Sequence, residues 1–155
     1  MNPVFMQEAI RLARENLDLN HGGPFGAVVV RAGAVVSRGW NQVTSTFDPT
    51  AHAEIVALRA AGHALGRFCL DDCELYTSCE PCPMCLAAAY WARIPVVYYA
   101  GTRADAAAAG FDDDLFYAEL ARPMAQRMMR MVPLLREEAE KVFEAWRAKS
   151  DKIPY

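Results

Sequence analysis

One histidine and two cysteines in this chain have the types and spacing of ligands for a single metal ion. His52 stands at the start of an apolar helical stretch, and Cys82 and Cys85 lie three positions apart within Pro81–Cys85. One imidazole and two thiolates suit Zn²⁺, and three protein ligands leave the fourth tetrahedral position to a water molecule. The spacing therefore predicts an open zinc site.

Glu54 follows the histidine by two residues and has no place in this ligand set. A carboxylate beside a metal-activated water can take a proton from that water and pass it to a substrate. We therefore expect Glu54 to be the proton carrier of a hydrolytic reaction.

Cys79 offers a competing ligand set. It is evenly spaced with Cys82 and Cys85, and with His52 the three cysteines could close a structural Cys3His site. Cys79 ends an expected strand, however, so its side chain should point away from the helical pair. A closed site would also leave Glu54 without a role. A zinc protein without catalytic activity is the alternative that this set leaves open.

The elements that must position these residues follow from periodicity and turn signals. Helices are expected at 3–19, 51–64, 83–93, 113–121 and 134–149, and strands at 27–31, 35–40, 74–78, 96–99 and, as a fifth, near 128–132. The first two strands should form an antiparallel hairpin, and helical crossovers join the later strands. The expected fold is α/β, a three-layer α-β-α sandwich with a central mixed five-stranded sheet.

Both halves of the metal motif fall at helix starts in this scheme. Unpaired N–H groups and the positive end of the helix dipole favour the thiolate over the thiol there. A separation of three residues places Cys82 and Cys85 on one helix face, so both can reach one ion. The strand at 74–78 should bring this helix beside the one that carries His52.

Composition and charge limit the class of protein. The 155 residues are 54% apolar and 23% charged, which fits one folded domain. No apolar run approaches the roughly 20 residues that cross a bilayer, and the first residues lack signal-peptide features. An odd number of crowded cysteines indicates metal binding or free thiols. We therefore expect a cytoplasmic protein that does not contact a membrane.

The charges are distributed unevenly. Residues 1–121 carry 8 basic and 14 acidic side chains, whereas residues 122–155 carry 8 basic and 5 acidic ones. A protein that binds a long nucleic acid usually has a surface with more positive charge. A small uncharged substrate fits this balance better than RNA, so no nucleic-acid partner is expected.

Motifs along nearly the whole chain form a recognisable pattern. They are Gly22–Ala27, Asn41, Asp48–Glu54, Leu75–Cys85, Tyr90–Arg93, Ala109–Asp113, Phe143–Trp146 and the terminal Tyr155. A His-x-Glu followed by Pro-Cys-x-x-Cys is the signature of zinc nucleobase deaminases. The chain resembles bacterial guanine deaminases of the cytidine deaminase superfamily. The zinc motifs are shared across the superfamily, whereas Gly110–Asp113 and the aromatic C-terminus are more specific.

The resemblance implies a reaction, a cofactor and a set of site residues. Guanine and water would give xanthine and ammonia, with Zn²⁺ held by His52, Cys82 and Cys85 and with Glu54 as proton shuttle. The implied substrate-binding residues are Phe25, Asn41, Ala53, Asp113 and Tyr155.

Three of these binding residues have specific expected roles. Phe25 would stack on the base, Asn41 would pair with a purine edge through one donor and one acceptor, and Asp113 would lie near the base. The structural alternatives are core packing for Phe25, turn formation for Asn41 and helix capping for Asp113.

The resemblance also implies how the chain assembles. Residues 1–155 would form a single deaminase domain, and the C-terminal segment 123–155 would act as an exchanged lid. In a homodimer this segment would cross to the neighbouring subunit and help to cover its active site. Phe143 and Trp146 would anchor it, and Tyr155 would reach the substrate.

Two other activities use the same zinc core. A tRNA adenosine deaminase would bind an anticodon loop, which the acidic N-terminal part and Phe111–Asp113 fit poorly. Other nucleobases and aminotriazines are the further alternative substrates, because the chemistry requires only an amine on an electron-poor ring carbon.

Overall fold

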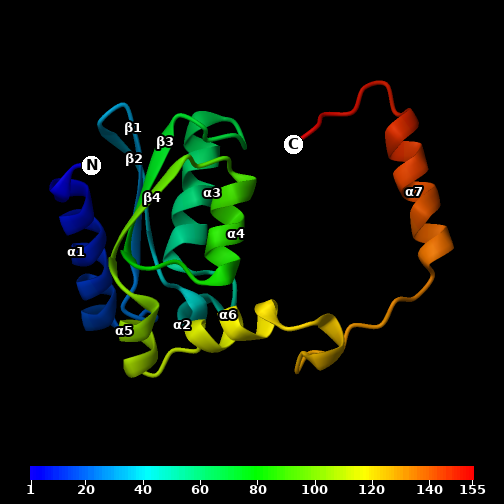
Figure 1. Cartoon of the computed structure of the whole chain (residues 1–155). Coiled ribbons are helices and arrows are strands. Elements are labelled where there is room, and N and C mark those ends of the chain that lie inside the picture. The colour runs from blue at the N-terminus through cyan, green and yellow to red at the C-terminus, as the bar shows by residue number, and fades with distance from the viewer. The chain divides into compact units, whose positions relative to one another are not determined.

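The computed structural model describes residues 1–155, which divide into two compact units, Met1–Tyr117 and Ala118–Tyr155. Figure 1 labels the elements along the chain. The helices are α1 (Pro3–Leu19), α2 (Val43–Thr46), α3 (Ala53–Leu65), α4 (Pro83–Trp91), α5 (Arg103–Ala108), α6 (Asp113–Ala121) and α7 (Arg136–Ala148), with a 3-10 turn at Met124–Gln126. The strands are β1 (Gly26–Arg31), β2 (Ala34–Trp40), β3 (Cys73–Cys79) and β4 (Val96–Gly101). None of the helices is long and apolar enough to cross a membrane.

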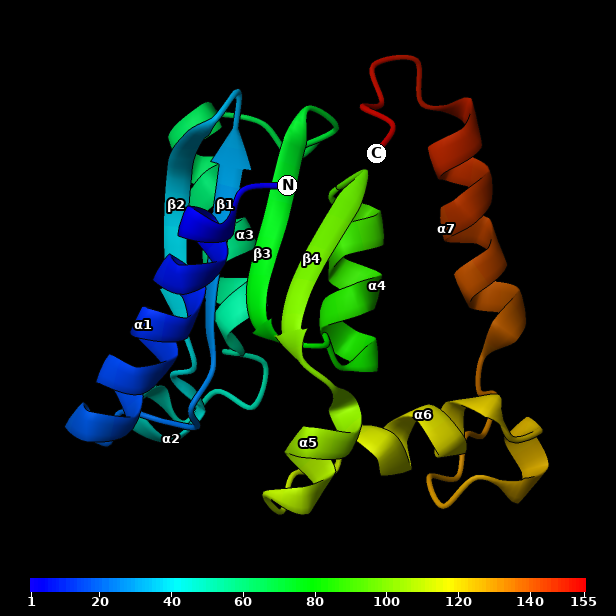
Figure 2. The same cartoon turned by 60° about the vertical axis from the view of Figure 1, so that its left-hand side comes forward.

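The sheet of the first unit is mixed, as the sequence predicted. Its strand order is β2-β1-β3-β4; β1 is antiparallel to both β2 and β3, and β3 is parallel to β4 (Figure 2). The crossover between β3 and β4 runs through α4. The sheet therefore brings the end of β3 and the start of α4 beside the hairpin.

The prediction of a fifth strand near 128–132 was wrong. Residues 128–132 form no strand, and Met128 and Met129 are exposed. This segment is apolar apart from Arg130, but three of its five residues are methionine, which lacks the stiff branched side chain that favours strands. The apolar composition therefore predicted a strand, but no neighbouring strand pairs with this segment.

Helices cover both faces of the sheet. Helix α1 packs on one face, and α3 and α4 lie along the other (Figures 1 and 2). Successive residues of β1 point to opposite faces, so Val28 and Val30 join the α1 side of the core while Val29 joins the α3 side. The first unit thus has the three layers that the sequence predicted.

Two glycines let the helices approach the sheet closely. A Cβ atom on Gly26 would lie 2.3 Å from the carbonyl oxygen of Ala9 in α1, and one on Gly39 would lie 2.2 Å from that of Ala53 in α3. Ala53 stands between His52 and Glu54. The contact between Gly39 and α3 therefore sets the position of the first half of the metal motif.

We expect Gly39→Ala to lower the free energy of unfolding of the zinc-free protein by about 1–3 kcal/mol, because the added methyl group forces α3 off the sheet. Zinc affinity should fall as well, since His52 moves with α3. Chemical denaturation and zinc titration measure both effects. Gly101→Ala is the control, because its Cβ would lie an ordinary 3.5 Å from the carbonyl oxygen of Ser78. Equal losses in the two variants would contradict this account.

Two short helices of the first unit were not predicted. Helix α5 begins with a reciprocal capping box, in which Thr102 Oγ1 accepts from the backbone N–H of Asp105 and Asp105 Oδ2 accepts from that of Thr102. The spacing of these two residues could have revealed it. Helix α2 is a single turn of Val-Thr-Ser-Thr without a side-chain cap, so its sequence carries no such signal.

The second unit contains the end of α6, the 3-10 turn and α7. Glu119 is buried and accepts a hydrogen bond from the backbone N–H of Met128 at 2.7 Å. The helix predicted at 134–149 is confirmed as α7, but its apolar residues Val142, Phe143 and Trp146 remain exposed. No apolar side chain of this unit is buried. The role of segment 123–155 as an exchanged lid stays a prediction.

Candidate active site

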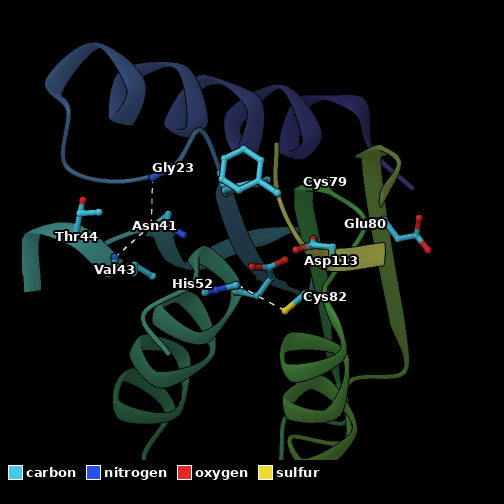
Figure 3. Close-up of a pocket in the computed structure, with 12 residues that line it drawn as sticks. Gly23, Asn41, Val43, Thr44, His52, Cys79, Glu80, Cys82 and Asp113 are labelled. Carbon is cyan, nitrogen blue, oxygen red and sulfur yellow. Dashed lines mark hydrogen bonds between the residues drawn. The ribbon is translucent and has the colours of Figure 1, made fainter. Parts of the chain in front are cut away.

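The three predicted metal ligands meet at the starts of α3 and α4. His52 and Cys82 are the N-cap residues of the two helices, and Cys85 lies in the first turn of α4. Their ligand atoms all lie within 4.8 Å of one another, and His52 Nδ1 is 3.6 Å from Cys82 Sγ (Figure 3). A nitrogen ligand about 2.0–2.1 Å and a sulfur ligand about 2.3 Å from a tetrahedral zinc ion lie about 3.5 Å apart. The donor types and their closeness therefore fit one zinc ion.

The electrostatics of the two cysteines also suit a cation. A hydrogen bond from Cys85, supported by His52, lowers the pKa of the Cys82 thiol to about 4. The same hydrogen bond, together with burial, raises the pKa of Cys85. The hydrogen bond with Cys82 likewise raises the pKa of His52. Cys82 and Cys85 together thus carry one negative charge and share one proton. A metal ion bound between them would replace that proton.

Cys79 lies outside this cluster. Its thiol donates to the carbonyl oxygen of Thr102 at 3.5 Å, and burial raises its pKa to about 11. The cluster consists of His52, Cys82 and Cys85 only. The closed Cys3His arrangement is therefore not supported.

Glu54 is buried in the first turn of α3, as expected for a residue that works beside the metal. Its exposed fraction is 6%, and its Oε1 accepts a hydrogen bond from the hydroxyl of Thr77 at 3.2 Å. Burial raises the pKa of its carboxyl group. A carboxylate with a raised pKa readily accepts a proton near neutral pH. The structure thus gives Glu54 the properties of a proton carrier.

A cavity of about 220 Å³ opens above these residues (Figure 3). It is lined by Gly23, Phe25, Asn41, Val43, Thr44, His52, Glu54, Cys79, Glu80, Cys82, Phe111 and Asp113. Sites for drug-sized ligands measure about 300–1,000 Å³, so this cavity suits a single small heterocycle. The predicted residues Phe25, Asn41 and Asp113 line the same cavity as the metal cluster.

Two phenylalanines form the apolar wall of the cavity. The rings of Phe25 and Phe111 meet edge to face, with centroids 4.7 Å apart and planes at 73°. Phe25 also packs against the core on the α3 side of the sheet. Phe25 therefore packs against the core, as one alternative predicted, and also lines the cavity. Its stacking on a base stays a prediction.

Asn41 presents a donor to the cavity rather than a donor and an acceptor. Its Oδ1 accepts from the backbone N–H groups of Gly23 and Val43, both at 3.2 Å, as the dashed lines of Figure 3 show. The expectation that both ends of the amide pair with a base needs this correction, because the oxygen is engaged by the protein. Only the amide N–H groups remain for a ligand.

Asp113 begins α6 and lines the cavity. Burial, with the nearby Cys82, raises the pKa of its carboxyl group. The side chain of Ala53 packs in the core and does not line the cavity. Tyr155 belongs to the second unit and is exposed. Substrate contacts of Ala53 and Tyr155 stay predictions.

The sequence did not single out several residues of the site. Thr77 holds Glu54, and Glu80 lines the cavity while its Oε2 accepts from the backbone N–H of Arg103 at 3.0 Å. Both residues belong to the Leu75–Cys85 motif, so their closeness in sequence to the metal-binding cysteines could have indicated a place in the site. Thr44 lies on α2 and had no signal, because that helix was not predicted.

Comparisons with known proteins agree with this geometry. Residues 2–101 match the family model of the cytidine and deoxycytidylate deaminase zinc-binding region. The chain is 49% identical to guanine deaminase from Bacillus subtilis (strain 168) over 152 residues, which cover 98% of this chain and 97% of that protein. A crystal structure of guanine deaminase from Bacillus subtilis matches with a TM-score of 0.95 and covers 100% of this chain and 99% of its own. A tRNA-specific adenosine deaminase from Aquifex aeolicus is 38% identical over 95 residues, which cover 61% of this chain and 62% of that protein.

Proposed function

Because the chain belongs to the cytidine and deoxycytidylate deaminase family, we propose that it is a zinc-dependent guanine deaminase that hydrolyses guanine to xanthine and ammonia. The observation that carries the proposal is the buried carboxylate of Glu54 beside a cluster of metal ligands, on the wall of a cavity sized for one base. Similarity to a guanine deaminase over nearly the full chain supports the choice of base.

The chemistry assigned to the residues follows from their positions. When bound by His52, Cys82 and Cys85, zinc would acidify water and so supply the nucleophile. Glu54 accepts a proton from the attacking water and delivers it to a ring nitrogen of guanine. Glu54 then takes the proton of the hydroxyl group now on C2 and passes it to the amino nitrogen. The bond between C2 and that nitrogen breaks, ammonia leaves, and C2 becomes the carbonyl carbon of xanthine. The raised pKa of Glu54 supports both transfers.

The cavity walls would hold the base in place for this step. The ring of Phe25 stacks on the purine, and the amide N–H of Asn41 donates to an acceptor on its edge. The carboxylate of Asp113 accepts from an N–H of the base. Ala53 contributes through its backbone N–H, which at the start of α3 has no partner within the helix.

The C-terminal unit would complete the site in a homodimer. The second unit buries no apolar side chain of its own, and Phe143 and Trp146 are exposed. Such residues are expected to pack against another protein surface. Exchange of residues 123–155 between two subunits would bury them and bring Tyr155 over the neighbour's cavity. The protein would act in the cytoplasm, where reducing conditions keep its five cysteines from forming disulfides.

We expect deletion of residues 150–155 to lower guanine turnover by about tenfold or more, because an open cavity admits water and holds the base less firmly. Zinc content should not change, since all three ligands lie in the first unit. Steady-state kinetics and metal analysis measure both. Tyr155→Ala should reproduce the loss, whereas Lys152→Ala should not. Full activity after the deletion would count against the lid.

A substrate panel separates the proposed function from its alternatives. The zinc-loaded protein should release ammonia from guanine far faster than from adenine, cytosine, an aminotriazine or a tRNA anticodon stem-loop. Conversion of the RNA alone would establish a tRNA adenosine deaminase instead. Release from none of them would favour a structural zinc protein.

A further inference from the structure

Asn16 is a buried polar residue near the C-terminal end of α1. It is 2% exposed, and its Nδ2 donates to the carbonyl oxygens of Gly23 at 2.7 Å and Asn41 at 2.9 Å. Its Oδ1 is buried without a hydrogen-bond partner. The Asn16 side chain thus acts as a donor to two backbone carbonyl groups that are 18 positions apart in the sequence.

Both residues whose carbonyl groups accept from Asn16, Gly23 and Asn41, line the cavity. The backbone N–H of Gly23 in turn donates to Asn41 Oδ1 (Figure 3). A Cβ atom on Gly22 would lie 2.4 Å from the carbonyl oxygen of Asn41 and 2.5 Å from its Oδ1. The Gly22–Gly23 turn thus packs closely against Asn41. Asn16 connects the two segments through its hydrogen bonds to the carbonyl oxygens of Gly23 and Asn41.

This arrangement fixes which end of the Asn41 amide faces the cavity. A flip of the amide would break the hydrogen bonds from Gly23 and Val43 and would place its N–H groups against these two donors. The amide nitrogen therefore stays on the cavity side. It attracts a hydrogen-bond acceptor on a ligand and repels an amine placed at the same point.

We propose that Asn16 is a positioning residue that determines specificity: it fixes the Gly22–Gly23 turn and so holds Asn41 as a donor that selects purines with an acceptor facing it. This inference rests on the proposed function, since it takes guanine as the substrate. Guanine offers two such acceptors on one edge, O6 and N7. Asn16 itself touches no substrate.

The test compares wild type with Asn16→Leu, which keeps the branching at Cγ but has methyl groups in place of the amide atoms and so has no donor. Three substrates are used: guanine, 2,6-diaminopurine with an amine in place of O6, and 7-deazaguanine with a C–H in place of N7. Wild type should prefer guanine by about tenfold or more over the analogue that lacks the contacted acceptor. In Asn16→Leu that preference should fall at least about fivefold, mainly through a higher KM for guanine.

A binding measurement supports the kinetics. In zinc-loaded protein that also carries Glu54→Gln, the Kd for guanine should rise about tenfold on Asn16→Leu, with zinc content unchanged. Leu12→Ala is the control, because it removes buried packing from the same helix without touching the turn. It should lower stability and leave the preference for guanine as in wild type.

The outcomes separate the two levels of the proposal. If wild type converts guanine but prefers it over neither analogue, or if folded Asn16→Leu keeps the wild-type preference, the role of Asn16 is overturned while the proposed function stands. If wild type does not convert guanine, the proposed function itself fails. If Asn16→Leu does not fold, Gly22→Ala must show the same loss of preference, because its methyl group displaces Asn41 from the other side.

Discussion

Replacement of Glu54 by glutamine is expected to lower guanine turnover by about 10³-fold or more, with zinc content and fold unchanged. Glutamine has nearly the same shape, and its carbonyl oxygen can still accept the hydrogen bond from Thr77. It cannot carry a proton, however, so neither the attack of water nor the departure of ammonia is assisted. Turnover kinetics, metal analysis and circular dichroism measure the three properties.

Glu80→Gln is the matched control for this prediction. Glu80 is a second carboxylate on the cavity wall, but its Oε2 is occupied by the backbone N–H of Arg103. We expect a much smaller loss of turnover there. A similar loss in both variants, or an unchanged rate in Glu54→Gln, would mean that Glu54 is not the proton carrier.

Loss of one thiolate ligand is the second change with a very large expected effect. In Cys85→Ser a hydroxyl replaces a buried thiolate donor, and a hydroxyl is a poor ligand for zinc at neutral pH. Bound zinc should fall from one ion per chain to nearly none after dialysis. Guanine turnover should then fall by about 10³-fold or more, since no activated water remains.

Thermal unfolding provides an independent measure of the same site. A ligand that binds only the folded state raises its stability, so added zinc should raise the Tm of the wild-type protein but not that of Cys85→Ser. Cys79→Ser is the control, because the Cys79 thiol bonds to Thr102 and lies outside the cluster. It should keep both zinc and turnover. Loss of zinc in Cys79→Ser would instead support a closed Cys3His site.

The two halves of the metal motif could be predicted because each half is local, although the halves stand 30 positions apart. His52 precedes Glu54 by two residues, and Cys82 precedes Cys85 by three, so a single helix start determines each pair. The β1–β2 hairpin followed in the same way from a short link. Patterns within single elements were therefore sufficient to identify the metal ligands and Glu54.

The binding half depends on contacts between distant segments, which periodicity does not reveal. Asn16 and Asn41 are 25 positions apart, and Thr77 and Glu54 are 23 apart, yet each pair shares a hydrogen bond. The engaged oxygen of Asn41 could not be foreseen, because the donors come from a turn and from the unpredicted helix α2. The false strand near 128–132 has the same origin, since strand formation requires a partner.

The most direct test of the central claim is the product balance of the zinc-loaded protein with guanine. We predict that it forms xanthine and ammonia in equal amounts, that a chelator stops the reaction, and that added zinc restores it. Failure to release ammonia from guanine while zinc is bound would contradict the account.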